Sequence, residues 1–149
     1  VARPDLLDPM AEALARLGLT RAVVVHGHGG LDEASLAGVN ALRLVENGQI
    51  RSESLDPQAL GLSLAPLSAL AGGDLATNAR LLEAVLRGEG PPAHSDVVAL
   101  NTALVLWAAG RCDDLSDGLA QARGTLAAGE PWRRLRALAA ALPPAASGG

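Results

Sequence analysis

The stretch "RAVVVHGHGGLDEAS", residues 21–35, constrains the fold more than any other part of the sequence. Residues 21–26 are too few for a helix and rich in β-branched valine, so they predict a strand buried on both faces, as in a parallel sheet. Gly27, Gly29 and Gly30 then predict a compact loop at the carboxyl end of this strand. Ligands of parallel α/β sheets bind beyond that end, so a site is expected here.

Composition limits the fold and the function in a few respects. The chain has 149 residues, which fits one domain, and it is 49% hydrophobic and 19% charged, which is typical of a globular protein. It has two Trp, no Phe and no Tyr, so Leu, Val and Ala must build the core, and Ala- and Leu-rich segments favour helices. The net charge of −4 is unfavourable for a general nucleic-acid binder.

The cellular location is inferred from what the sequence lacks. Cys112 is the single cysteine and cannot form an internal disulfide, which suits a reducing compartment. No apolar run reaches the length of a membrane span, and no N-terminal signal is evident. We therefore expect a cytoplasmic protein that binds neither membranes nor nucleic acid.

Turn and cap residues predict the other elements. Asn47-Gly48, with alternating polar and apolar residues on both sides, predicts a β-hairpin over 41–55 with a type I′ turn. Asp8-Pro9 predicts the N-cap of a helix over 9–17, and a short helix is expected near 67–70. Four further helices are expected to start near Asp74, Ser95, Asp114 and Pro131 and to end at Gly88, Gly110, Gly129 and Pro143. Residues 143–149 are expected to be a disordered tail.

The predicted fold class is α/β: a β-hairpin and flanking helices within a mixed, mainly parallel sheet. The strand over 21–26 needs a neighbour on each edge, and the hairpin supplies one. Either the chain forms a small mixed sheet under a helical layer, or the other strands precede Val1 in a longer protein.

Asp32 and Glu33, at the far end of the glycine loop, are the candidate metal ligands. Mg²⁺ prefers a few carboxylates together with water and substrate phosphates, so the loop could hold a phosphorylated ligand through Mg²⁺. The alternative is a tight turn whose acids cap the next segment. A zinc site of His26, His28 and Asp32 lacks a further Cys or His nearby. Asn101, within an apolar helical run, needs buried partners and is expected to be structural.

Several motifs occur together in the order of one known family. The string H-G-x-G-G-L-D-E-x-S is followed by "LRLVENGQI", "LDPQALGL", G-G-D-x-x-x-N-A and "VALNTALVLWAAG". With this order and spacing, the chain resembles the C-terminal part of the anthranilate phosphoribosyltransferase family. The resemblance implies transfer of the phosphoribosyl group of phosphoribosyl pyrophosphate to the amine of anthranilate, with release of pyrophosphate, in tryptophan biosynthesis. It also implies that Asp32 and Glu33 help to bind Mg²⁺ on the pyrophosphate.

The resemblance further implies which parts of such an enzyme lie elsewhere. Residues 1–142 would be the C-terminal part of the α/β domain. A G-T-G-G-D-type loop, the basic residues that hold anthranilate, several strands and an N-terminal helical domain that forms a homodimer would precede Val1. The chain alone is therefore expected to be inactive. The alternatives are a related pyrimidine nucleoside phosphorylase, against which the H-G-x-G-G-L-D-E string argues, and a non-catalytic binding or scaffold module.

Overall fold

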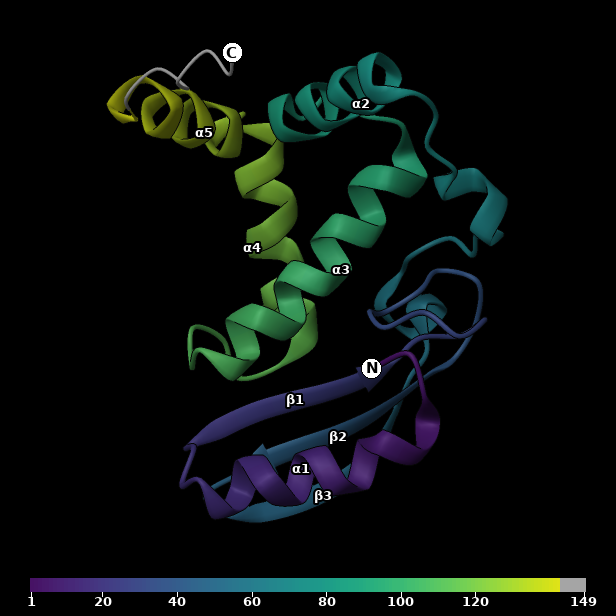
Figure 1. The fold of residues 1–149 in the computed structure, drawn as a ribbon, viewed down its shortest axis with the longest axis vertical. Helices are drawn as coiled ribbons and strands as arrows, with labels where there is room; N and C mark the ends of the chain where they lie inside the picture. Colours follow the sequence, from purple (N-terminus) through teal and green to yellow (C-terminus); the bar gives the residue numbers. More distant parts are fainter. Residues whose placement is uncertain (143–149) are drawn as a thin grey trace, which may run out of the picture.

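A three-stranded antiparallel sheet lies between one N-terminal helix and a group of C-terminal helices (Figure 1). The computed structural model describes residues 1–142, so the expected tail lies outside the described residues. The sheet consists of β1 (Arg21–His26), β2 (Asn40–Glu46) and β3 (Gln49–Leu55), in that order. The helices are α1 (Leu7–Arg16), α2 (Leu75–Arg87), α3 (Pro92–Ala108), α4 (Leu115–Ala127) and α5 (Glu130–Ala141), with 3₁₀ turns at Pro4–Leu6, Pro57–Leu60 and Leu67–Leu70.

The predicted mainly parallel sheet is wrong for the described part of the chain. β1 pairs with β2 and β2 pairs with β3, and both pairs are antiparallel. β1 is nonetheless covered on both faces: Ala22 and Val24 face α1, whereas Val23 and Val25 pack with the core under α3. A run of β-branched residues predicts two-sided burial, but it does not report the direction of the neighbouring strand. The α/β class itself is confirmed.

The predicted turn and helix caps are confirmed where the residues concerned adopt the turn conformation or bond backbone groups within a few residues. Asn47 and Gly48 have φ angles of 51° and 80°, as a type I′ turn requires, and they join β2 to β3. The Asp74 carboxylate accepts a hydrogen bond from Thr77 N, and that of Asp114 accepts one from Asp117 N. Both acids therefore cap the helices whose starts they predict.

Two helix starts differ from expectation. Asp8 is expected to cap α1, but the helix begins at Leu7 and the Asp8 carboxylate instead pairs with Arg43 on β2, at 2.5 Å from Nε. This contact lowers the pKa of Asp8 and joins α1 to the sheet. α3 begins at Pro92 and not near Ser95, because a proline is well accommodated at the first helical position.

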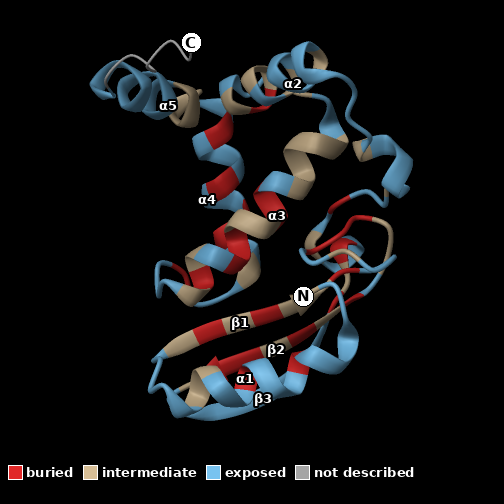
Figure 2. Cartoon of the chain, viewed as in Figure 1, coloured by how far each residue is buried: buried red, intermediate tan, exposed pale blue. Residues whose placement is uncertain are grey.

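The main core lies between the sheet and the crossing of α3 and α4 (Figure 2). The α3 residues Ala99, Leu100, Ala103, Leu104 and Trp107 are buried in it. Gly118 of α4 lets this helix approach α3 closely, since a Cβ there would lie 3.2 Å from the Cα of Ala103 and 2.9 Å from the Sγ of Cys112. None of the helices in residues 1–142 has the length and apolar character needed to cross a membrane.

The two glycines of α4 should respond oppositely to alanine. Gly118→Ala overpacks the contact with Ala103 and should lower the free energy of unfolding by about 1–3 kcal/mol. Gly124 has open space around its Cα, so Gly124→Ala should raise it by about 0.5–1 kcal/mol through better helix propensity. Urea unfolding of both variants would measure this, and equal effects would contradict the packing of α3 on α4.

α3 also carries apolar side chains on a face that the described residues leave open. Val98, Thr102 and Val105 lie on one side of the helix, and Val105 is 65% exposed. A helix that is apolar on all sides is typical of a position buried from all sides. The open face therefore favours contact with further protein.

The 149-residue chain should self-associate through this α3 face. Val105→Glu should shift the chain toward monomer in sedimentation velocity, because the substitution adds a charge at an exposed apolar position of the face while keeping helix propensity. Arg136→Glu, on α5, is the matched surface control. A wild-type chain that is already monomeric at tens of micromolar would contradict the prediction.

Candidate functional site

The loop after β1 closes on itself at once. Gly27 N donates to Leu31 O at 2.8 Å and Gly30 N donates to Gly27 O at 3.1 Å, which makes a tight turn over 27–31. Gly29 and Gly30 have φ angles of 84° and 88°, in the region that favours glycine. The sequence-predicted glycine turn is therefore present.

Gly27 is required because the chain passes directly over it. A Cβ at Gly27 would collide with the carbonyl oxygen of Glu33, and it would also lie 3.0 Å from the Cβ of Leu31. The return segment of the loop thus lies on the end of the strand. This close approach fixes the backbone of Glu33 relative to β1.

Asn40, at the start of β2, holds the loop from the side of the sheet. It is 1% exposed. Its Oδ1 accepts hydrogen bonds from His28 N at 3.1 Å and from Ser35 N at 2.7 Å. Its Nδ2 donates to the carbonyl oxygens of Ser35, Gly38 and Leu55. One buried amide therefore joins both sides of the loop to the hairpin.

Asn101 holds the loop from the opposite side, on α3. Its Oδ1 accepts a hydrogen bond from Ala34 N, and its Nδ2 donates to Ala34 O, both at 2.9 Å. The sequence identifies Asn101 as an amide in need of buried partners but cannot name Ala34, because Ala34 lies 67 residues away. It misses Asn40 altogether, since nothing near Asn40 in sequence marks it as a contact of residues 28 and 35.

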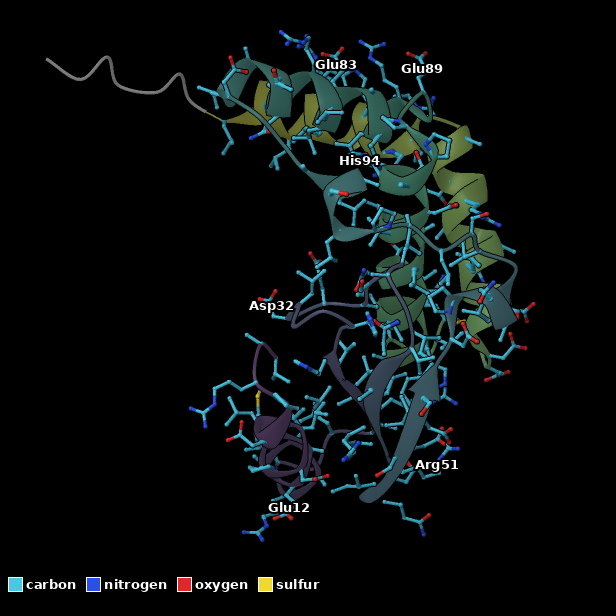
Figure 3. The ribbon with its side chains drawn as sticks, turned by 90° about the vertical axis from the view of Figure 1, so that its right-hand side faces the viewer. Glu12, Asp32, Arg51, Glu83, Glu89 and His94 are labelled. Atoms are coloured by element: carbon cyan, nitrogen blue, oxygen red, sulfur yellow. The ribbon has the colours of Figure 1, made fainter. Side chains whose placement is uncertain are left out.

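Asp32 and Glu33 lie together between the turn and the buried segment, and both are exposed. Figure 3 shows Asp32 at the outer tip of the loop, pointing away from the sheet and the helices. Glu33 borders a cavity of about 350 Å³ beside α3 and another of about 270 Å³ that also contains His94. Both carboxylates are therefore accessible to a ligand from outside.

Nearly every other acid in residues 1–142 is already engaged with protein. These acids pair with arginine or cap a helix; the exceptions besides Asp32 and Glu33 are Glu89 and Asp117, which are separate from each other. The alternative in which Asp32 and Glu33 cap the next segment is not supported, since no hydrogen bond to either carboxylate is present in the described part. Two adjacent free carboxylates repel each other, and a cation relieves that repulsion.

The donor set fits magnesium better than zinc. The described residues contain no group of three or more His, Cys, Asp or Glu that could hold a metal. His26 Nδ1 is hydrogen-bonded to Val1 O at 2.8 Å, and the His28 ring lies over Gly38. Mg²⁺ keeps several waters and takes only one or two carboxylates beside substrate phosphates, which is what Asp32 and Glu33 can offer.

Comparison with known proteins identifies the family. Residues 1–131 match the model of the "Glycosyl transferase family, a/b domain". The chain belongs to this glycosyl transferase family. The motif-based resemblance is also confirmed: the chain is 65% identical over 142 residues to the anthranilate phosphoribosyltransferase of Synechococcus sp. (strain CC9311).

Solved structures of glycosyl transferase relatives share the fold. The anthranilate phosphoribosyltransferase of Thermus thermophilus aligns with a TM-score of 0.83 and 44% identity, covering 94% of this chain and 41% of that one. The Saccharomyces cerevisiae enzyme in complex with PRPP and Mg aligns with a TM-score of 0.80 and 26% identity, covering 91% of this chain and 39% of that one. The Synechococcus match covers 95% of this chain and 41% of the relative, so the chain spans about two fifths of the relatives' length.

Gly27→Ala tests the geometry of the loop. The added methyl group must displace the Glu33 carbonyl, so the variant should lose about 1–3 kcal/mol of stability and expose the amide of Ala34 to faster hydrogen exchange. Hydrogen–deuterium exchange over residues 27–36 measures the local effect, with Gly124→Ala as the control. Unchanged exchange at Ala34 would show that the strand end and Glu33 are not in contact.

Proposed function

We propose that the chain forms the cation-binding part of an anthranilate phosphoribosyltransferase, with Asp32 and Glu33 as ligands of Mg²⁺. The observation that carries the proposal is the adjacent pair of exposed carboxylates without protein partners, on a loop fixed from both sides. The support from relatives is their name and the PRPP and Mg bound to the yeast enzyme. The relatives' name and these ligands favour an anthranilate phosphoribosyltransferase over a nucleoside phosphorylase.

The proposed reaction transfers the phosphoribosyl group to the amine of anthranilate. The amine nitrogen forms a bond to C1 of the ribose, the bond from C1 to the pyrophosphate oxygen breaks, and the nitrogen loses a proton. Negative charge grows on the departing pyrophosphate, and bound Mg²⁺ stabilises such charge electrostatically. Asp32 and Glu33 hold the cation in a fixed place, and β1 with its glycine turn sets that place.

The remaining parts of the enzyme are proposed to come from the rest of a longer chain. Since this chain spans about 41% of the Synechococcus relative, the loop that binds phosphoribosyl pyrophosphate, the residues that hold anthranilate and the helices of a homodimer would lie outside residues 1–149. The open α3 face and the cavity beside Glu33 are then the surface on which those segments would pack.

Removal of the carboxylates in the complete transferase chain tests the proposal. Asp32→Ala with Glu33→Ala should lower the rate at limiting Mg²⁺ by about 100-fold, because charge on the leaving group is no longer neutralised in place. The rate should be measured across a Mg²⁺ titration, with saturating anthranilate and phosphoribosyl pyrophosphate.

Glu89→Gln is the matched control, since Glu89 is another acid without a protein partner in the described residues and lies just beyond the end of α2. It should leave the Mg²⁺ titration unchanged. A double variant at positions 32 and 33 that kept the normal Mg²⁺-dependent rate would refute the assigned role.

A further inference from the structure

We propose that Asn101 is a positioning residue for the cation site, which it serves by fixing the peptide groups next to Glu33. The inference rests on the proposed function, because it concerns the direction in which Asp32 and Glu33 present their carboxylates. Asn101 touches no candidate ligand itself. It acts through Ala34, which directly follows the acidic pair.

The hydrogen bonds leave the amide group no freedom to rotate. Oδ1 accepts from Ala34 N, while the two protons of Nδ2 go to Ala34 O at 2.9 Å and to Val97 O at 3.0 Å. The bond to Val97, one turn earlier on α3, fixes the orientation of the side chain relative to its helix. The amide then offers Ala34 a donor and an acceptor in the spacing that a neighbouring strand would offer.

Burial makes this contact costly to lose. Ala34 is 0% exposed with Asn101 in place, so its N–H and C=O depend on this side chain for a partner. A buried backbone group without a partner costs about 1–3 kcal/mol, which is enough to move the segment. The peptide group of Glu33 and Ala34 carries that N–H, so its movement displaces the Glu33 backbone directly.

Asn40 does not duplicate this function. It binds His28 N and Ser35 N, so it closes the loop from the sheet side and from the residue beyond Ala34. Asn101 supplies side-chain hydrogen bonds from α3 to the loop, and the α3 residues Val97, Val98 and Thr102 line the cavity next to Glu33. Asn101 therefore fixes the position of the acids relative to α3.

The chain contains a control with the same hydrogen-bond pattern as Asn101, at a more exposed position. Asn78 on α2 makes the same pair of hydrogen bonds to a different backbone: its Oδ1 accepts from Gly73 N at 2.8 Å and its Nδ2 donates to Gly73 O at 3.0 Å. Loss of either amide removes two such bonds. Only the loss of Asn101 releases the residue next to the acids.

The experiment uses the complete transferase chain and measures Mg²⁺ binding in the presence of inorganic pyrophosphate by calorimetry. Asn101→Ala should weaken Mg²⁺ binding by about 10-fold, in the range found when residues that orient metal ligands are removed. Asn101→Ser should do the same with less effect on folding, because a serine hydroxyl can still donate to Val97 O but is too short to reach Ala34. Asn78→Ala should leave Mg²⁺ binding within about twofold of wild type, because it frees no residue beside the acids. Thermal unfolding of all variants gives the effect on stability.

The outcomes separate this inference from the proposed function. If the double variant Asp32→Ala with Glu33→Ala weakens Mg²⁺ binding and Asn101→Ser does not, the positioning role is wrong and the cation site stands. If Asn101→Ser and Asn78→Ala weaken binding equally, the role of Asn101 is general stability and the inference is overturned. If that double variant leaves Mg²⁺ binding unchanged, the proposed function and the inference both fail.

Discussion

The burial of Ala34, Ser35 and Leu36 is the constraint on which the candidate site depends. All three are 0% exposed, although they belong to the long connection between β1 and β2. Connections normally run over the surface because their backbone groups need partners, and here Asn40 and Asn101 provide the partners. Asp32 and Glu33 are the last exposed residues before this buried segment, so their position follows from the core.

This arrangement suits a cation that is demanding about geometry. Mg²⁺ requires near-ideal octahedral coordination and gives up water reluctantly, so its protein ligands must be placed accurately. Side chains on an unsupported loop would lose much of the binding free energy to the cost of being ordered. A loop tied to the sheet and to α3 has lost that freedom on folding, before any ligand binds.

Local features could be predicted from the sequence, and contacts between distant residues could not. The Asn47-Gly48 turn and the caps at Asp74 and Asp114 depend on groups within a few residues, so their signals are in the sequence itself. Asp8 carries the same capping signal, but its partner Arg43 lies 35 residues away and takes its carboxylate. The valine run predicts burial on two faces but not the direction of the strand that pairs with it, and within residues 1–142 that strand, β2, is antiparallel.

The candidate site divides in the same way. Glycines and acids in one short string identify the loop, because backbone freedom and charge are properties of single residues. Of the two amides that support the loop, Asn40 cannot be identified from the sequence. Asn101 can, but its partner in the loop cannot, since a buried asparagine in an apolar run shows only that a partner must exist. A polar residue inside a strongly apolar helix, such as Asn101 between Leu100 and Ala103, is thus a signal of a long-range contact even where the contact is unknown.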